Sequence, residues 1–138
     1  MKEQNESLDF YGVRYIVNDL DATVAFYKDL LGFTVDMQVA PGFAILSKGR
    51  LHLYMNKPGF GGAGQSTPDG TAPASGGWNR IILQVDNLEA TIATLKKKNA
   101  PFRNDLVTGQ GGKQILLQDP SGNLIELFEP NEQGKSLK

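Results

Sequence analysis

One carboxylate stands out because of the residues around it. Glu126 lies at the centre of the run LIELF, residues 124–128, and every other member of that run is apolar. If this segment is a strand buried on both faces, the charge requires a cation, a metal ion or hydrogen-bond donors beside it. The chemistry of the protein therefore depends on which of these partners contacts Glu126.

The single histidine, His52, is the second candidate for chemistry. Any general acid or base that works near neutral pH through an imidazole must be this residue. It stands between two leucines, a pattern that is also typical of a plain surface or core position on an edge strand. The chain has no cysteine, so thiol nucleophiles, disulfides, thiolate metal sites and any Cys-His pair are excluded. With His52 as the single histidine, we expect no Ser-His-Asp triad either.

Other side chains could bind a ligand or serve the structure alone. Arg14 could bind an anionic ligand or pair with a structural carboxylate, while Gln84 and Gln114 could donate to a ligand or hydrogen-bond within the core. Aromatic residues could stack on a flat ligand or fill the core. The aromatic candidates are Phe43, Tyr54, Phe60 and Trp78.

Length and charge restrict the class of protein. The 138 residues suit one domain, and 14 Lys+Arg against 15 Asp+Glu give a net charge of −1. No basic stripe is visible, so nucleic acid is not an expected partner. No apolar run approaches the ~20 residues of a membrane span, and the polar start MKEQNESLDF lacks the apolar part of a signal peptide. We therefore expect a cytoplasmic protein that does not enter membranes.

The chain contains the same unit twice. Each unit reads as a strand, a helix and three further strands, and residues 17–23 (VNDLDAT) align without a gap with residues 85–91 (VDNLEAT). Module one covers about residues 10–56 and module two about 78–130. The expected strands are 12–17, 33–39, 42–47 and 51–56, then 80–85, 102–108, 114–118 and 124–128. The first helix should run from 21 to 30 and end at Gly32, the second should begin at 86–89, and residues 119–123 (DPSGN) should form a hairpin turn.

The segment between the modules is different in composition. Residues 57–77 are rich in glycine and proline and hold one large apolar residue, Phe60. The segment is either a linker between the modules or a loop that folds over a site. Residues 1–9 read as a loose tail.

Three segments together resemble the vicinal oxygen chelate superfamily, which includes glyoxalase I, bleomycin-resistance proteins and extradiol dioxygenases. They are VNDLDATVAFYKDLLGF (17–33), its echo at 85–91, and DPSGNLIEL (119–127). The resemblance implies an α+β fold in which two βαβββ modules form a cupped, eight-stranded mixed sheet with the helices outside. It also implies a pocket inside the cup and, usually, a homodimer.

The resemblance further implies four positions that hold a metal in the metal-dependent members, on the first and last strands of each module. These positions fall on Gly12, Arg80, Glu126 and, depending on the register, His52 or Leu53. Glycine has no side chain, and arginine is a permanent cation that cannot coordinate a metal. We therefore expect no metal and no cofactor, with Arg80 as the partner of Glu126.

Two functions remain open at this point. The first is metal-free binding of a small, partly aromatic molecule in the cup, for resistance or sequestration, with contacts from the residues listed next. The ligand-binding candidates are Arg14, Phe43, Tyr54, Trp78, Arg80, Gln84, Gln114 and Glu126. The alternative is an enzyme, a lyase, isomerase or dioxygenase that uses Glu126 and His52, either without a metal or with a divalent metal.

Overall fold

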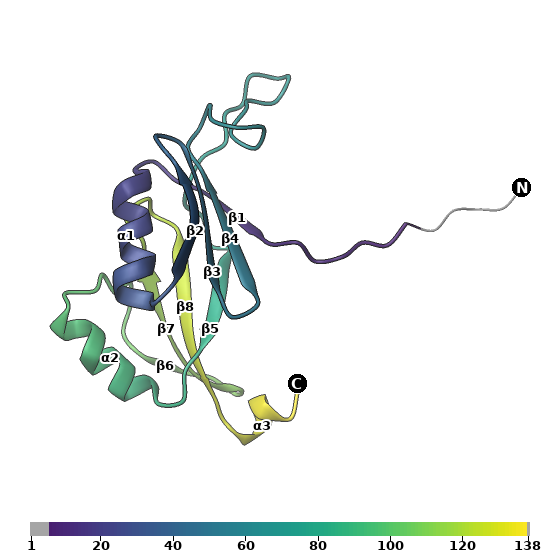
Figure 1. Ribbon diagram of the computed structural model, residues 1–138. Coiled ribbons are helices and arrows are strands. Elements are labelled where there is room, and N and C mark those ends of the chain that lie inside the picture. The colour runs from purple at the N-terminus through teal and green to yellow at the C-terminus, as the bar shows by residue number, and fades with distance from the viewer. Residues whose placement is uncertain (1–5, 138) are drawn as a thin grey trace, which may run out of the picture.

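The computed structural model describes residues 6–137, so the first five residues of the predicted tail lie outside it. Residues 6–137 form eight strands and three helices (Figure 1). Module one consists of β1 (Val13–Ile16), α1 (Leu20–Leu31), β2 (Thr34–Val39), β3 (Phe43–Lys48) and β4 (Leu51–Asn56). Module two consists of β5 (Arg80–Gln84), α2 (Leu88–Lys97), β6 (Val107–Thr108), β7 (Gly112–Gln118) and β8 (Leu124–Pro130), and α3 (Glu132–Lys135) follows it.

The two long helices begin with the same device. Asp19 caps α1 by accepting a hydrogen bond from the Ala22 amide at 3.1 Å, and Asn87 caps α2 by accepting one from the Ala90 amide at 3.0 Å. Each cap satisfies an amide that the helix itself leaves without a partner. Gly32 ends α1 in the left-handed conformation, with φ of 74°, which a glycine adopts without strain. The predicted start and end of the first helix are therefore confirmed.

The strands form two open, mixed sheets of four strands each. Their orders are β1-β4-β3-β2 and β5-β8-β7-β6, with a parallel pair at β1–β4 and at β5–β8 and antiparallel pairs elsewhere. Helices α1 and α2 cover the same side of the sheets and leave the other side open (Figure 1). The predicted α+β class with two βαβββ modules is confirmed. The eight strands are divided between two sheets and do not form a single ladder.

A tyrosine side chain joins the two sheets where their edges meet. The hydroxyl of Tyr15, on edge strand β1, donates to the Leu124 carbonyl at 2.8 Å and accepts from the Ile81 amide of edge strand β5 at 2.9 Å. Burial raises the pKa of this phenol to about 12. The seam between the sheets is thus held by a neutral, fully engaged hydroxyl.

The β7–β8 turn of module two is anchored on module one. Tyr27 of α1 donates to Asp119 Oδ2 at 2.8 Å, and Thr23 Oγ1 lies 2.8 Å from Ser121 Oγ. Asn123 Nδ2 donates to the Ile16 carbonyl at 2.8 Å. Asp119 is buried, and this burial raises the pKa of its carboxyl group. The predicted DPSGN hairpin turn is present, and it also connects the modules just before the strand that carries Glu126.

Each sheet has one face toward the helices and one open face. On β4, Leu53 and Met55 are buried against the helix layer, whereas Tyr54 lies on the opposite face, because side chains alternate along a strand. The apolar core lies between the sheets and the helices and draws on both modules. No helix within the described chain combines the length and apolar character needed to cross a membrane.

Module two departs from the predicted strand pattern at residues 102–108. Only Val107 and Thr108 form β6, and Phe102 makes an isolated bridge with Leu117. The Asn104 side chain accepts a hydrogen bond from the Leu116 amide at 2.9 Å, taking the place of a backbone carbonyl in the ladder. The predicted long strand is therefore wrong for residues 103–106. The short helix α3 was not predicted either.

Candidate functional site

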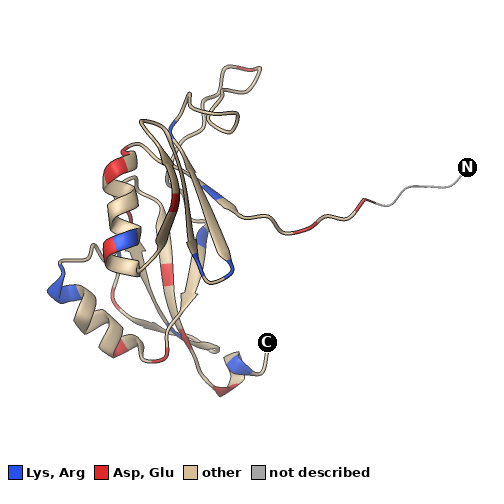
Figure 2. Ribbon diagram, viewed as in Figure 1, with Lys and Arg blue, Asp and Glu red and all other residues tan. Residues whose placement is uncertain are grey.

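Arg80 is the residue that contacts Glu126. Arg80 on β5 stands opposite Leu124, and Glu126 on β8 stands opposite Ile82, so the two side chains are diagonal neighbours on the open face. Nε and Nη2 of Arg80 both donate to Oε1 of Glu126, at 3.0 and 2.8 Å. Glu126 is only 6% exposed, so this charge-assisted pair replaces the water that the carboxylate loses. Figure 2 shows the two opposite charges on the neighbouring strands β5 and β8.

The internal repeat identifies the equivalent of Glu126 in module one. The alignment of residues 17–23 with 85–91 places Arg14 opposite Ile82 in the repeat, and Gly12 opposite Arg80. Ile82 pairs with Glu126 across the parallel strands, and Arg14 pairs with Tyr54 in the same way. The equivalent position is therefore Tyr54.

The sequence left open whether His52 or Leu53 is the equivalent of Glu126, and the strand pairing excludes both. Leu53 is 0% exposed and packs in the core, so it does not reach the open face. His52 lies on the same face as Tyr54 but two residues earlier, where it pairs with Ser47. His52 and Glu126 belong to different sheets. Neither of the two residues considered is the equivalent of Glu126.

Tyr54 also explains the glycine at position 12. A Cβ on Gly12 would lie 2.6 Å from Cε1 of Tyr54 and 2.9 Å from the His52 carbonyl oxygen, so a side chain there would collide with both. The Tyr54 ring stacks on Tyr11 with centroids 5.6 Å apart, and the Arg14 guanidinium lies 5.2 Å from its centroid. A hydrogen bond with Tyr11 is the largest cause of the raised pKa of Tyr54. The phenol is therefore neutral at physiological pH.

The donor chemistry at these four positions does not fit a divalent metal. Gly12 supplies no donor, Tyr54 is a neutral phenol, Arg80 is a cation, and the carboxylate of Glu126 is already bound by Arg80. A zinc site needs three or four good ligands. Across residues 6–137 there is no group of three histidine, cysteine, aspartate or glutamate side chains that could hold a metal.

Arg14 is held in place by a buried amide. Its Nη1 donates to Oδ1 of Asn56 at 2.6 Å, and Asn56 is only 1% exposed. Nδ2 of Asn56 in turn donates to the carbonyl of Phe60, in the glycine-rich segment, at 3.1 Å. Asn56 was not among the sequence candidates, although it shares the alternation of His52 and Tyr54 on β4. The segment 57–77 is thus connected to the open face through one side chain.

The remaining candidates lie on the same open face. Phe43 pairs with Asn56 on sheet one, and on sheet two Gln84 and Gln114 both pair with Phe128 from opposite sides. Just before β5, Trp78 is exposed, and the guanidinium of Arg103 lies 5.1 Å from its ring centroid. Arg103 was not predicted as a site residue. Its Nη1 donates to Gln118 Oε1 at 3.3 Å.

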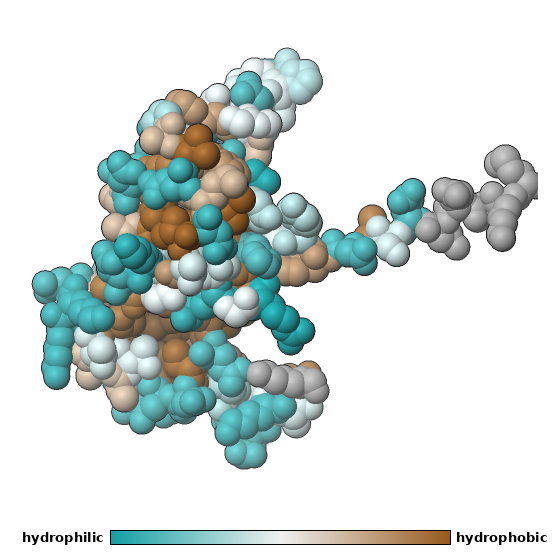
Figure 3. All heavy atoms as spheres, in the orientation of Figure 1, coloured by the Kyte–Doolittle hydropathy of each residue, from teal (hydrophilic) through white to brown (hydrophobic). Residues whose placement is uncertain are grey.

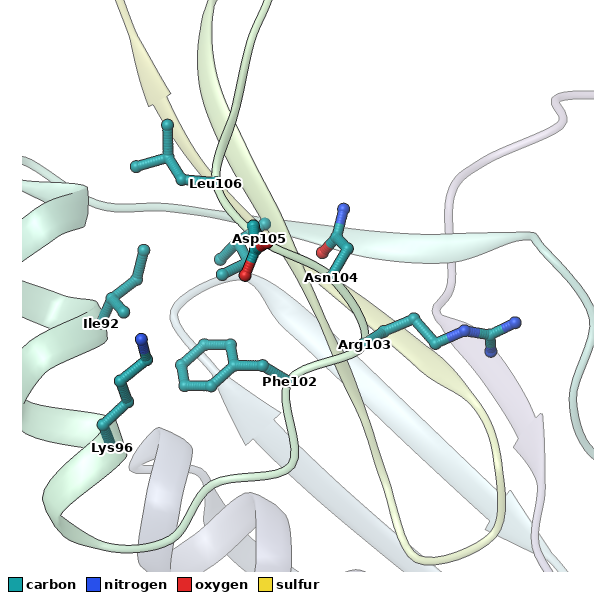
Figure 4. A pocket seen from close by; sticks show the side chains of 8 residues that line it. Ile92, Lys96, Phe102, Arg103, Asn104, Asp105 and Leu106 are labelled. Atoms are coloured by element: carbon teal, nitrogen blue, oxygen red, sulfur yellow. The ribbon is translucent and has the colours of Figure 1, made fainter.

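Two cavities are relevant to the choice of site. One, of about 490 Å³, lies at the seam and is lined by Val13, Leu51 and residues 81–84, together with the Lys48–Gly49 turn. Another, of about 410 Å³, lies on the helix side, where the truncated β6 leaves room (Figure 4). The side chains of Ile92, Lys96 and Phe102 point into this cavity, whereas that of Arg103 points away from it. Only the seam cavity adjoins the open face.

The chain belongs to the Glyoxalase/Bleomycin resistance protein/Dioxygenase superfamily, because the model of that family matches residues 8–127. It is 28% identical over 127 residues to the mitochondrial methylmalonyl-CoA epimerase of Homo sapiens, covering 83% of this chain and 70% of that protein.

Solved structures show the same fold. A lactoylglutathione lyase from Agrobacterium tumefaciens matches with a TM-score of 0.68 and 18% identity, covering 90% of this chain and 96% of that chain. An antibiotic binding protein from Streptomyces sp. CB03234 matches with a TM-score of 0.66 and 19% identity, covering 92% of this chain and 100% of that chain. The fold thus occurs both in proteins named as enzymes and in one named as a binding protein.

Proposed function

We propose that this protein binds a small, partly aromatic organic molecule on the open face of its two sheets, without a metal ion. The observation that carries the proposal is the Arg80–Glu126 pair, which consumes the one suitable metal ligand at the place where metal-dependent relatives bind their ion. The aromatic and amide side chains on the same face would supply stacking and hydrogen bonds. The antibiotic binding protein with this fold is consistent with such a role.

An isomerase is the second candidate, because the human relative at 28% identity is named as an epimerase. Proton abstraction by Glu126 would need a carboxylate oxygen free to accept a proton. Both hydrogen bonds that Arg80 donates to Glu126 go to Oε1, so Oε2 is the oxygen that could accept a proton. His52 lies on the other sheet, so it does not supply a second acid or base beside Glu126. The lack of this second group favours binding over catalysis.

Titration of chelator-treated protein with small aromatic acids, amides and amines tests the proposal. Backbone amide signals of β5 and β8 should shift in response to at least one of these classes with no metal added. Shifts that appear only after Zn²⁺, Ni²⁺ or Mn²⁺ is supplied would contradict the proposal. If the protein catalyses an isomerisation and the E126Q variant loses that activity, the isomerase would be favoured.

We also propose that the protein forms a homodimer. Residues 6–10 lead away from the body of the molecule ahead of β1 (Figures 1 and 3), and they carry Leu8 at 96% exposure and Phe10 at 73%. Met37 and Val39 are exposed on edge strand β2. Apolar side chains on an extended arm and on an unpaired strand edge favour association with another chain.

A further inference from the structure

The open face carries Arg14, a cation with no carboxylate beside it among the described residues. Arg14 projects from β1 onto this face, beside Tyr15, whose hydroxyl joins the two sheets. Within residues 6–137 no carboxylate oxygen lies within 4.0 Å of Arg14, in contrast with Arg80, which is paired with Glu126. Arg14 can therefore still bind an anion, whereas Arg80 on the other side of the seam is already paired with Glu126.

The guanidinium of Arg14 is held in a fixed orientation. Tyr54 supports it from one side, with Tyr11 stacked behind Tyr54, and Asn56 accepts one of its N–H groups at 2.6 Å. A guanidinium has five N–H donors, and only this one hydrogen bond is present among the described residues. The remaining donors retain the planar fork that matches a carboxylate or a phosphate. Because the side chain is already ordered, binding an anion costs less conformational entropy.

The strands around Arg14 carry no unpaired carboxylate, although the whole chain has a net charge of −1 and Glu6 and Asp9 lie on the arm ahead of β1. Arg103 lies over Trp78 farther along the open face, again with no carboxylate within 4.0 Å among the described residues. Of the strands nearest the seam, β1, β4 and β5 contain no acidic residue. On β8, Glu126 is paired with Arg80, and Glu129 accepts a hydrogen bond from Leu88 of α2 on the helix side.

We propose that Arg14 is an anion-binding residue of the open face, and that the ligand carries a carboxylate, phosphate or phosphonate group. The inference rests on the proposed function. It narrows the expected ligand from small, partly aromatic molecules in general to those that carry an acidic group. Asn56 is the positioning residue in this arrangement, because it holds the guanidinium and also hydrogen-bonds Phe60 in the segment after β4. Tyr54 supports Arg14, because the guanidinium lies 5.2 Å from its ring centroid and the Tyr11 ring is stacked on it at 5.6 Å.

The test compares probes that differ in charge and little in shape. Benzoate, phenylphosphonate and neutral benzamide are titrated into ¹⁵N-labelled protein, and the backbone and arginine Nε–H signals are followed. We expect both anions to shift the Arg14 Nε–H signal and the amides around β1 and β4, with an affinity about ten-fold or more above that of benzamide. R14Q should reduce this preference to near unity, whereas R50Q, in the exposed β3–β4 turn, should preserve it.

A second variant leaves Arg14 in place. N56D puts a carboxylate where Asn56 Oδ1 now contacts Nη1, so it should abolish the preference for anions even though the arginine is retained. Equal affinity for benzoate and benzamide, or an unchanged preference in R14Q and N56D, would overturn the role of Arg14 and leave the proposed function standing. If none of the three probes shifts signals of the open face at millimolar concentration, both proposals fall.

Discussion

At the scale of single residues, the pairing of Arg80 with Glu126 determines what the open face can do. A buried carboxylate is stable only with a partner, and here the partner is a guanidinium that donates twice to one oxygen. We propose that the same contact keeps the carboxylate from holding a metal ion. One substitution tests the stability that the pair provides, and another tests metal binding.

Replacement of Arg80 by methionine should destabilise the protein by about 2 kcal/mol at pH 7, because Glu126 would keep its charge and lose its cation. Urea unfolding at pH 7 measures the loss. The double variant R80M/E126L serves as the control and should recover most of the loss. An R80M protein as stable as the parent at pH 7 would show that the pair contributes nothing.

Replacement of Arg80 by histidine should create a weak zinc site. The variant places an imidazole beside Glu126 and releases the carboxylate from the guanidinium, so we expect at least a ten-fold gain in Zn²⁺ affinity over the parent. Calorimetric titration measures the gain, and R80H/E126Q should abolish it. Failure of R80H to bind zinc more tightly than the parent would count against the position assigned to these two side chains.

At the scale of elements, Tyr15 is the connection between the two sheets. Its folded pKa of about 12 lies above the unfolded value of 10.0, so the folded chain holds the phenolic proton more tightly. The stability that this proton contributes is complete below pH 10 and is lost as the pH rises from 10 to 12. By the size of the shift it is on the order of 2 kcal/mol.

The variant Y15F should therefore be less stable than the parent at pH 7, by about 1–2 kcal/mol, since the Ile81 amide and the Leu124 carbonyl lose their partner. The gap between the two proteins should narrow between pH 10 and 12, as measured by urea unfolding across that range. T94V, which removes the hydroxyl of an exposed threonine on α2, is the matched control and should follow the parent. A gap that stays constant to pH 12 would contradict a buried, neutral Tyr15.

Much of this arrangement could be predicted from the residues. Alternation, the repeat and the turn residues predicted the modules, the caps and the hairpin. The isolated charge of Glu126 predicted that it needs a partner, and the family resemblance indicated Arg80. The pairing of Tyr54 with Arg14 could not be predicted, because a one-residue register depends on the strand ladder and not on local composition. The loss of strand at 103–106 could not be predicted either, since the Asn104 side chain replaces a backbone acceptor there.

At the scale of the whole molecule, the two modules form one unit with an open face on one side and helices on the other. Tyr15 joins the sheets, and the 119–123 turn anchors module two on α1. The open face spans both modules, so a ligand there contacts side chains that are far apart in the sequence. The arm at residues 6–10 extends beyond this unit.

If the arm contributes to a homodimer, the double substitution L8S/F10S should weaken association about ten-fold or more, because two exposed apolar side chains would no longer be buried between chains. Sedimentation equilibrium measures the dissociation constant. L137S, at an exposed leucine near the opposite terminus, is the matched control. A parent protein that is monomeric at all concentrations would refute the dimer, and an unchanged dimer in L8S/F10S would refute the role of the arm.

The proposal that the open face holds no metal ion can be tested directly. Protein purified without a chelator is analysed for bound transition metals, and chelator-treated protein is then titrated with Zn²⁺, Ni²⁺, Mn²⁺ and Fe²⁺ beside E126Q. We predict far less than one metal ion per chain and no saturable binding that depends on Glu126. One bound ion per chain, lost in E126Q, would show that the carboxylate coordinates a metal and that Arg80 is displaced from it.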